Sequence, residues 1–170
     1  MIRFIYADQL ETYPALGASM FLDRARQFAE RLNWNVTVDG KGFERDAYDA
    51  INPLYIIAQD ARGRHAGSMR VLPTTGPTMI NDHFSELTEG VKIQSPFIWE
   101  CTRFCLAPEA EANVSSALML GVLEMGLNAH LDHIAGVFDA RMIRVYARVG
   151  WGPTVLGTLG EGREAISAGL

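Results

Sequence analysis

The sequence predicts a single α/β domain in which helices pack on a mixed β-sheet. Short apolar runs alternate along the chain with longer segments whose apolar residues recur every three to four positions, which are the patterns of buried strands and amphipathic helices. The length of 170 residues, with 48% apolar and 21% charged residues, suits one globular domain with a sizeable core. The expected order of elements, β-α-loop-β-β-β-α-β-α-β, favours one α/β sandwich with a mixed sheet.

The N-terminal third is expected to form a strand, a helix and a long loop. Residues 1–7 resemble a strand, and residues 20–32 carry apolar side chains at helical spacing, with Asn33 as a suitable helix end. Residues 36–53 are polar, contain glycine and finish in proline. They predict a long loop, a kind of segment that is often functional.

The rest of the chain gives shorter, more apolar elements. Residues 54–59 and 65–72 predict the two strands of a hairpin. The remaining elements are a turn with a short helical piece (76–87), a strand (97–107), a helix (113–131), a strand (134–139), a helix closed by Gly150 (140–150) and two final strands (151–157 and 164–170).

Several classes of protein are disfavoured by composition. No apolar run approaches the ~20 residues that span a bilayer, and residues 1–10 lack the pattern of a secretory signal, so we expect a cytoplasmic protein that does not bind membranes. A net charge of −5 argues against general nucleic-acid binding. Cys101 and Cys105 lie in one predicted strand, roughly 13 Å apart if extended, so a disulfide between them is not expected.

Two groups of candidate functional residues lie in the N-terminal third. Arg24 and Phe28 are four positions apart and share a helix face, with Trp34 just beyond; the alternative is two core aromatics beside a surface arginine. Asp46 and Asp49 are three apart in the long loop. They can receive a cation or a ligand ammonium group, or they can simply form an Asx-turn.

A third group, Glu100 and Arg103, interrupts the apolar strand 97–107. Burying either charge unpaired is costly, so the pair either fixes local structure or faces a cleft where charge is used. In a regular strand, side chains three apart point to opposite faces. A shared site therefore requires a bulge or a local twist, and bulges are frequent beside active sites.

The fourth group is basic. Arg141, Arg144 and Arg148 are spaced to share one helix face, which indicates either a docking surface for an acidic partner or a solvated face. No metal site is predicted, because His130 and His133 have no Glu or Cys motif near them. Residues 160–162 lack the context of a phosphate loop.

Taken together, in this order and spacing, these motifs resemble the acyl-homoserine-lactone synthases, the LuxI-type autoinducer synthases. The resemblance covers residues 20–157. It rests on RARQFAERLNW (24–34), ERDAYD (44–49), SMRVLPTTGPTM (68–79), Phe84 and IWECTRF (98–104).

The resemblance implies a GNAT-like three-layer α-β-α sandwich around a mixed, splayed sheet, and one synthase domain over residues 1–170. It implies an acyltransferase that makes quorum-sensing signals from S-adenosylmethionine and an acyl thioester, releasing methylthioadenosine. The acyl donor would be acyl carrier protein or acyl-CoA. S-adenosylmethionine would be a substrate, and no cofactor is expected.

Site residues follow from the resemblance and from residue chemistry. Each set below is an expectation for this chain. The catalytic set is Glu100, Arg103, Asp46 and Asp49, and the S-adenosylmethionine-binding set is Arg24, Phe28, Trp34, Arg70 and Phe104. The acyl-pocket set is Met79, Phe84, Trp99, Met119, Leu123 and Phe138, with Phe104 as a further candidate, and the carrier-docking set is Arg141, Arg144 and Arg148.

The chemistry assigns roles within these sets. The substrate α-amine, with a pKa of roughly 7.7–8.0, must be uncharged to attack the thioester, and Glu100 is the candidate general base. Arg103 or Arg24 can hold the substrate carboxylate as a fork. Phe28 and Trp34 can face the sulfonium and adenine, while the two aspartates can orient Arg24 or bind the amine.

The chain departs from the family pattern in two places. It stops at AISAGL (165–170), so the last strand is expected to be shortened. Gly136 stands where many relatives carry Thr, a position linked in the family to 3-oxo acyl chains, which favours a substrate without the 3-oxo group.

Two other functions compete. Residues 140–151 also resemble the late helix of ordinary GNAT acetyl-CoA N-acetyltransferases, although the Q/R-x-x-G-x-G/A pyrophosphate loop is missing before helix 113–131. A non-catalytic ligand-binding domain on the same fold is the second alternative, since fold does not fix function.

Overall fold

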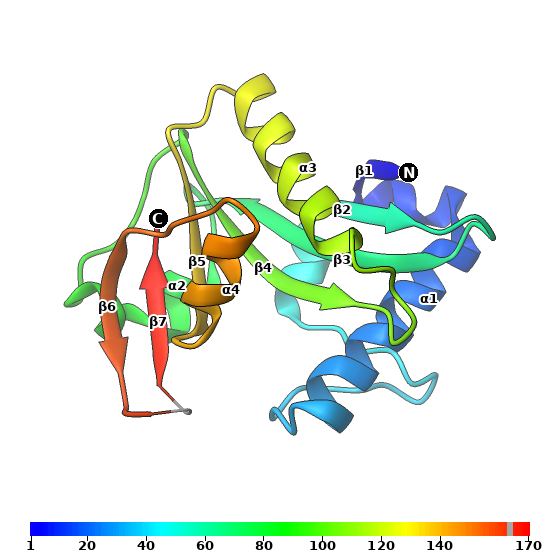
Figure 1. Ribbon diagram of the computed structural model, residues 1–170, viewed down its shortest axis with the longest axis horizontal. Coiled ribbons are helices and arrows are strands. Elements are labelled where there is room, and N and C mark those ends of the chain that lie inside the picture. The colour runs from blue at the N-terminus through cyan, green and yellow to red at the C-terminus, as the bar shows by residue number, and fades with distance from the viewer. Residues whose placement is uncertain (163–164) are drawn as a thin grey trace. The chain divides into compact units, whose positions relative to one another are not determined.

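A computed structural model describes residues 1–162 and 165–170, and the chain divides into two compact units (Figure 1). The first unit comprises Met1–Val71 and Arg103–Gly121, and the second comprises Leu72–Thr102 and Val122–Leu170. The strands follow the order β1-β2-β3-β4-β5-β7-β6 in a mixed seven-stranded sheet.

The strands of the first unit form an antiparallel meander. They are β1 (Ile2–Tyr6), β2 (Leu54–Gln59) and β3 (His65–Pro73). β1 pairs with β2 from Ile2↔Ala58 to Tyr6↔Leu54, and β2 pairs with β3 from Leu54↔Val71 onward. The predicted first strand and hairpin are therefore confirmed.

Helices cover both faces of this meander. α1 (Pro14–Ala25) packs on one face, in a buried cluster made by Ile5, Leu10, Leu16, Met20, Phe21, Tyr55 and Ile57. The first half of α3 (Val114–Asn128) packs on the other face, where a Cβ on Gly121 would lie 3.0 Å from Ile56 Cγ2. Ile56 alternates with Tyr55 and Ile57 along β2, so the two helices lie on opposite faces.

The predicted first helix changes its winding before it ends. After α1 the chain makes a π-helical segment, Arg26–Arg31, in which the Leu32 N–H donates to the Gln27 carbonyl at 3.1 Å. Asn33 then takes a left-handed conformation with φ 53°, which ends the helix where the sequence predicted. Single π-helical turns are frequent at functional sites, and this one carries Phe28.

The second unit holds the start of β4 (Ile98–Leu106), β5 (His133–Asp139), β6 (Val155–Leu159) and β7 (Ile166–Gly169). β4 and β5 pair in parallel from Ile98↔His133 to Glu100↔Ala135. β5 then pairs with β7, and β7 with β6, both antiparallel. All four strands were predicted, although residue 164 of the last one lies outside the described residues.

Helical elements again cover both faces. The segment formed by α2 (Met79–His83) and a 3₁₀ turn (Ser85–Thr88) buries Ile80 and Leu87 against Ala135 and Ala168. On the other face lies α4 (Met142–Arg148), whose Tyr146 ring centre is 5.4 Å from that of Phe138. Phe138 is three positions after Ala135 in β5, so the two side chains point to opposite faces. Each unit is thus layered α-β-α, which confirms the predicted fold class.

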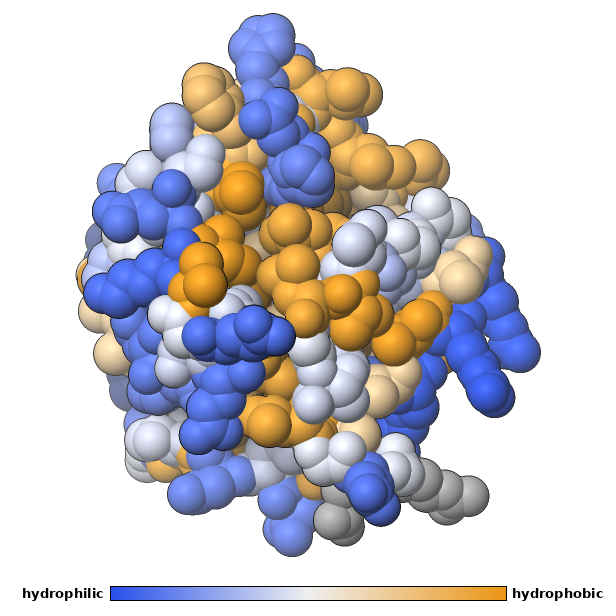
Figure 2. All heavy atoms as spheres, turned by 90° about the vertical axis from the view of Figure 1, so that its left-hand side faces the viewer, coloured by the Kyte–Doolittle hydropathy of each residue, from blue (hydrophilic) through white to orange (hydrophobic). Residues whose placement is uncertain are grey.

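β6 is the last strand in the sheet order, and it exposes apolar side chains. Val155, Leu156 and Leu159 are each more than a third exposed. Figure 2 shows apolar side chains gathered on the side of the molecule that includes this strand. Among the described residues, no helix has both the length and the apolar character needed to cross a membrane.

Candidate active site

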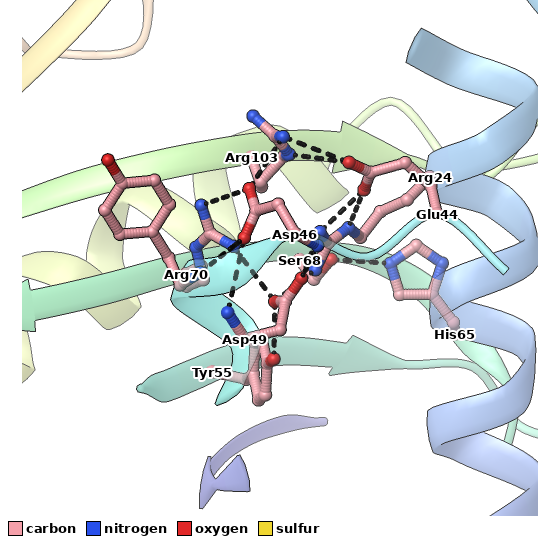
Figure 3. Close-up of polar contacts among 10 residues, drawn as sticks. Arg24, Glu44, Asp46, Asp49, Tyr55, His65, Ser68, Arg70 and Arg103 are labelled. Carbon is pink, nitrogen blue, oxygen red and sulfur yellow. Dashed lines mark hydrogen bonds and ion pairs between the residues drawn. The ribbon is translucent and has the colours of Figure 1, made fainter. Parts of the chain in front are cut away.

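Three arginines and three carboxylates from distant parts of the sequence meet in the first unit. They form an ion cluster (Figure 3) made of Arg24, Glu44, Asp46, Asp49, Arg70 and Arg103. α1 supplies Arg24, the long loop supplies the carboxylates, β3 supplies Arg70 and β4 supplies Arg103. The charges are equal in number and alternate, so the cluster is neutral and can be buried.

Arg24 lies at the centre of the buried side of the cluster. Its Nε donates to Glu44 Oε2 at 2.6 Å, and its two Nη atoms donate to the two oxygens of Asp49 at 2.9 Å each. This fork-to-fork pairing fixes both direction and distance. Glu44 is placed for it because its N–H donates to the Phe21 carbonyl at 3.2 Å, which ties the loop to α1.

The loop carboxylates are positioned by their own backbone. Asp46 precedes a 3₁₀ turn (Ala47–Ile51), accepts hydrogen bonds from the Tyr48 and Asp49 N–H groups, and donates its own N–H to Asp49 Oδ2. The Asx-turn interpretation of this pair was therefore right, whereas the binding of a cation or a ligand ammonium group by the pair stays a prediction. The same carboxylates accept hydrogen bonds from arginines.

Arg70 and Arg103 complete the cluster. Arg70 donates to both oxygens of Asp46, with Nη2–Oδ2 at 3.0 Å. Arg103 donates from Nε to Glu44 Oε1 at 3.1 Å and from Nη2 to Asp46 Oδ2 at 2.7 Å. Arg103 has a φ of 55°, a left-handed conformation rare for a strand residue, so regular alternation along β4 is broken at this position.

Burial and charge set the protonation states of the cluster. Burial lowers the pKa of Arg24, but the hydrogen bond and charge of Asp49 outweigh it and raise that pKa above its ordinary value. Burial raises the pKa of Asp49, but the hydrogen bonds and charge of Arg24, with the charge of Arg70, lower it overall. Asp49 therefore stays ionised, and Tyr55, whose pKa is raised by burial, donates its hydroxyl proton to Asp49 Oδ1 at 2.7 Å.

One edge of the cluster is partly exposed. The side chains of Arg24, Glu44 and Arg70 are at most 1% exposed, whereas Asp46 is 20% and Arg103 is 9% exposed. The Arg103 guanidinium lies 5.4 Å from the Phe28 ring centre. Phe28 in turn stacks on Trp34, with ring centres 5.2 Å apart and planes 9° apart, and Trp34 is 45% exposed. The predicted aromatic pair thus adjoins the exposed charged edge.

A second polar chain lies between α1 and β3 beside the cluster. Asp23 Oδ2 is 2.8 Å from His65 Nδ1, and His65 Nε2 is 2.9 Å from Ser68 Oγ; Figure 3 shows the latter contact. A carboxylate, an imidazole and a hydroxyl follow one another in the same order as in the Asp-His-Ser triad of serine hydrolases. Ser68 is 2% exposed. This row of hydrogen-bonded side chains joins α1, which carries Arg24, to β3, which carries Arg70.

Glu100 belongs to the second unit. It is 1% exposed, and its Oε1 and Oε2 accept hydrogen bonds from the Ile80 and Met79 N–H groups at 2.6 and 2.9 Å. It lies at the end of the β4–β5 pairing. The carboxylate is therefore held in one orientation by the first turn of α2.

The predicted acyl-pocket residues have different surroundings. Phe84 packs against the buried cluster around Ile80 and Leu87, and Phe138 packs against Tyr146 and Trp151. Met79, Trp99, Phe104 and Met119 are half-buried. Leu123 is 58% exposed on α3, so its side chain is open to solvent in this structure.

The basic stripe is at the surface. Arg141, Arg144 and Arg148 are exposed, but Arg141 precedes α4 as its N-cap, and its Nη2 lies 2.9 Å from Asp139 Oδ2. The helix itself therefore presents Arg144 and Arg148, one turn apart. In the described parts of the chain, no group of three or more His, Cys, Asp or Glu side chains could hold a metal ion.

Two members of this arrangement were missed from the sequence. Glu44 joins two arginines of the ion cluster, and Tyr55 holds Asp49. Glu44 had a signal, because it lies two positions before Asp46 in the same polar loop. Tyr55 had none, since a tyrosine in a strand is ordinarily a core residue.

The layered fold is that of the N-acyltransferases. A solved acyl-CoA N-acyltransferase from Pseudomonas aeruginosa matches with a TM-score of 0.66 at 13% identity, covering 99% of this chain and 97% of the other. At that identity the likeness shows the fold alone.

Comparison by sequence defines the family. A family model described as autoinducer synthase matches residues 8–170. An acyl-homoserine-lactone synthase of Rhizobium etli is 40% identical over 92% of this chain and 76% of its own length, and one of Agrobacterium fabrum is 35% identical over 88% and 75%. The chain therefore belongs to the autoinducer synthase family, and it is an enzyme of the acyltransferase class.

Solved structures agree. The synthase LasI matches with a TM-score of 0.84 at 27% identity, over 99% of this chain and 89% of LasI. The CoA-dependent synthase BjaI, solved with S-adenosylmethionine and isopentyl-CoA, matches with a TM-score of 0.87 at 26% identity, over 99% of this chain and 81% of BjaI.

Proposed function

We propose that this chain makes N-acyl-homoserine lactones from S-adenosylmethionine and an acyl thioester, with the first unit binding S-adenosylmethionine. The observation that carries this assignment is the exposed edge of the ion cluster beside the Phe28–Trp34 stack. A zwitterionic amino acid with a sulfonium and an aromatic base needs charged groups and aromatic faces side by side, and this edge provides both.

The roles within the cluster follow from its contacts. Asp49 already binds Arg24 through both oxygens, and Asp46 binds Arg70 in the same way. The aspartates therefore orient the arginines, which is one of the two roles expected for them. Arg103, the most exposed arginine of the cluster, is the proposed partner of the substrate carboxylate.

The exposed face of Trp34 is the proposed surface for the sulfonium or adenine. Its other face is already covered, because Phe28 stacks on it and Phe28 is 2% exposed. The stack fixes the orientation of the indole before the ligand arrives. A pre-oriented aromatic face loses little conformational freedom on binding.

The first step is acyl transfer. The substrate amine attacks the thioester carbonyl, a C–N bond forms, the C–S bond breaks and the donor leaves as a thiolate. Glu100 is the proposed general base for the amine proton, directly or through water, because two backbone N–H groups hold its carboxylate in place. The second step is attack of the carboxylate oxygen on its own γ-carbon, which expels methylthioadenosine. Holding the bent conformer is the main contribution there.

The acyl donor is proposed to be acyl-CoA or acyl carrier protein. The apolar residues of the second unit that include Phe84 and Phe138 are the proposed lining for the acyl chain. Arg144 and Arg148 carry the charge that either donor requires, since both are anionic. Replacing both arginines by Glu should weaken donor binding more at low salt than at high salt. If the double variant and the unmodified enzyme had equal kinetics at both salt concentrations, this docking face would be excluded.

One incubation tests the proposed function. The purified chain is supplied with S-adenosylmethionine and a series of acyl-CoA and acyl-carrier-protein thioesters, and lactone and methylthioadenosine are measured by mass spectrometry. Both products should appear in equal amounts. Acylated product without methylthioadenosine would indicate an ordinary acetyltransferase, and neither product would indicate a binding domain.

A further inference from the structure

Thr78 carries a buried hydroxyl that no described residue binds. Among the side chains of residues 1–162 and 165–170, its Oγ1 is the one buried oxygen or nitrogen without a hydrogen-bonding partner. Thr78 is 0% exposed, so bulk solvent does not reach it. A buried hydroxyl left unpaired destabilises a fold, whereas valine has nearly the same shape and no such cost.

The local structure explains why the hydroxyl has no partner. Thr78 is the N-cap of α2, with φ −142° and ψ 150°, and an N-cap threonine normally accepts a hydrogen bond from the N–H two or three positions on. Here the Ile80 N–H donates to Glu100 instead, and so does the Met79 N–H. The Glu100 carboxylate thus performs the capping, and the Thr78 hydroxyl is not needed to hold α2.

The hydroxyl is nevertheless close to Glu100. Covalent geometry keeps Oγ1 within about 4.5 Å of the Met79 nitrogen, and that nitrogen lies 2.9 Å from Glu100 Oε2. The Thr78 hydroxyl and the Glu100 carboxylate therefore both lie beside the Met79 nitrogen, so a ligand group bound between them can contact both. A hydroxyl both donates and accepts, so it suits a donor or an acceptor there.

We propose that the Thr78 hydroxyl hydrogen-bonds the reacting group on which Glu100 acts. This inference rests on the proposed function, in which that group is the amine of S-adenosylmethionine or the carbonyl of the acyl thioester. Thr78 would then be retained for the bound state, at a cost to the stability of the unliganded protein.

The test compares two variants of Thr78 with a matched control in the same unit. Thr74 is 1% exposed, but its Oγ1 donates to the Ser95 and Ile98 carbonyls at 2.9 and 2.8 Å. Thr74→Val should lower Tm by several degrees, because it removes the donor to the Ser95 carbonyl and the acceptor of the Ser95 N–H. Thr78→Val should leave Tm unchanged or raise it by about 2–5 °C, while lowering kcat/KM about tenfold. Thr78→Ser should stay within about threefold of the unmodified enzyme.

Kinetics with each substrate varied in turn then identify the ligand. A raised KM for S-adenosylmethionine assigns the hydroxyl to the amine, and a change confined to kcat or to the acyl donor assigns it to the thioester. Full activity of Thr78→Val, or a fall in its Tm like that of Thr74→Val, would overturn the inference. If the unmodified enzyme released no methylthioadenosine, the proposed function itself would fail and this inference with it.

Discussion

The guanidinium of Arg103 binds the carboxylate of Glu44, with Nε 3.1 Å from Oε1, across 59 positions of sequence. The other oxygen of Glu44 receives Arg24 Nε at 2.6 Å. Glu44 is 0% exposed, so its charge is compensated by these two arginines and not by solvent. It therefore links α1 to β4, and the geometry of the exposed edge depends on it.

Replacing Glu44 tests this link. Glu44→Gln removes one negative charge from a neutral buried cluster and leaves excess positive charge among the arginines. We expect the free energy of unfolding to fall by about 3 kcal/mol, measured by urea unfolding. The control is Glu11→Gln at an exposed position, which should change that free energy by less than about 0.5 kcal/mol. Equal losses for the two variants would show that Glu44 has no special role in stability.

Asp49 predicts how stability depends on pH. Its pKa is lowered in the folded protein because the arginines outweigh burial, while in the unfolded chain the pKa is about 3.9. A lowered folded pKa means that Asp49 stabilises the fold above the unfolded pKa and loses that contribution as pH falls below it. The difference in unfolding free energy between the unmodified protein and Asp49→Asn should thus be constant above about pH 5 and shrink below about pH 4. A difference that stays constant into more acidic buffer would contradict this.

Local pattern was enough to predict most of the fold. The hairpin of β2 and β3 alternates and turns within a few residues, and α1 ends at Asn33 because a left-handed residue stops a helix. The charged members Arg24 and Arg103 could also be chosen, because charged residues are unusual in apolar segments, and Phe28 could be chosen because it shares a helix face with Arg24.

What the sequence could not predict depends on long-range contacts. Glu44 and Asp46 differ in burial although they share a loop, and only the packing of that loop against α1 decides which is covered. The capping of α2 by Glu100, 20 positions away from Ile80, replaces a threonine that local rules would choose. The left-handed Arg103 has no local cause, since arginine does not favour that conformation.

Trp34 separates ligand binding from stability. Its ring is 45% exposed, so Trp34→Ala should cost less than about 1 kcal/mol of unfolding free energy. The loss of a cation–π or stacking face should raise KM for S-adenosylmethionine about tenfold. Trp34→Phe keeps an aromatic face and should retain most of the affinity. If Trp34→Ala bound S-adenosylmethionine normally by calorimetry, the ligand would lie elsewhere.

Glu100 combines a proposed catalytic role with a structural one. Glu100→Gln removes the base, so acyl transfer should fall sharply while S-adenosylmethionine binding, measured by calorimetry, stays near normal. The amide also offers only one oxygen to two N–H donors, those of Met79 and Ile80, so the unfolding free energy should fall by about 1–3 kcal/mol. Retained release of methylthioadenosine and lactone would remove Glu100 from the proposed mechanism.

Gly157 shows where β6 cannot tolerate a side chain. It lies in β6 against the 3₁₀ turn Ser85–Thr88, and a Cβ there would be 2.3 Å from the Leu87 carbonyl oxygen. The contact is with backbone, which cannot rotate away as a side chain can. Gly157→Ala should therefore separate β6 from this turn and lower the unfolding free energy by about 1–3 kcal/mol.

The matched control for Gly157 is Gly126, within α3, where a Cβ would have no atom within 4 Å. Because alanine is the better helix former, Gly126→Ala should leave stability unchanged or raise it by about 1 kcal/mol. If the unfolding free energy falls for Gly157→Ala and rises for Gly126→Ala, the difference comes from the surroundings of the two glycines, because the chemical change is the same. If both variants unfolded at the same urea concentration as the unmodified protein, β6 would not pack on the Leu87 backbone as closely as described.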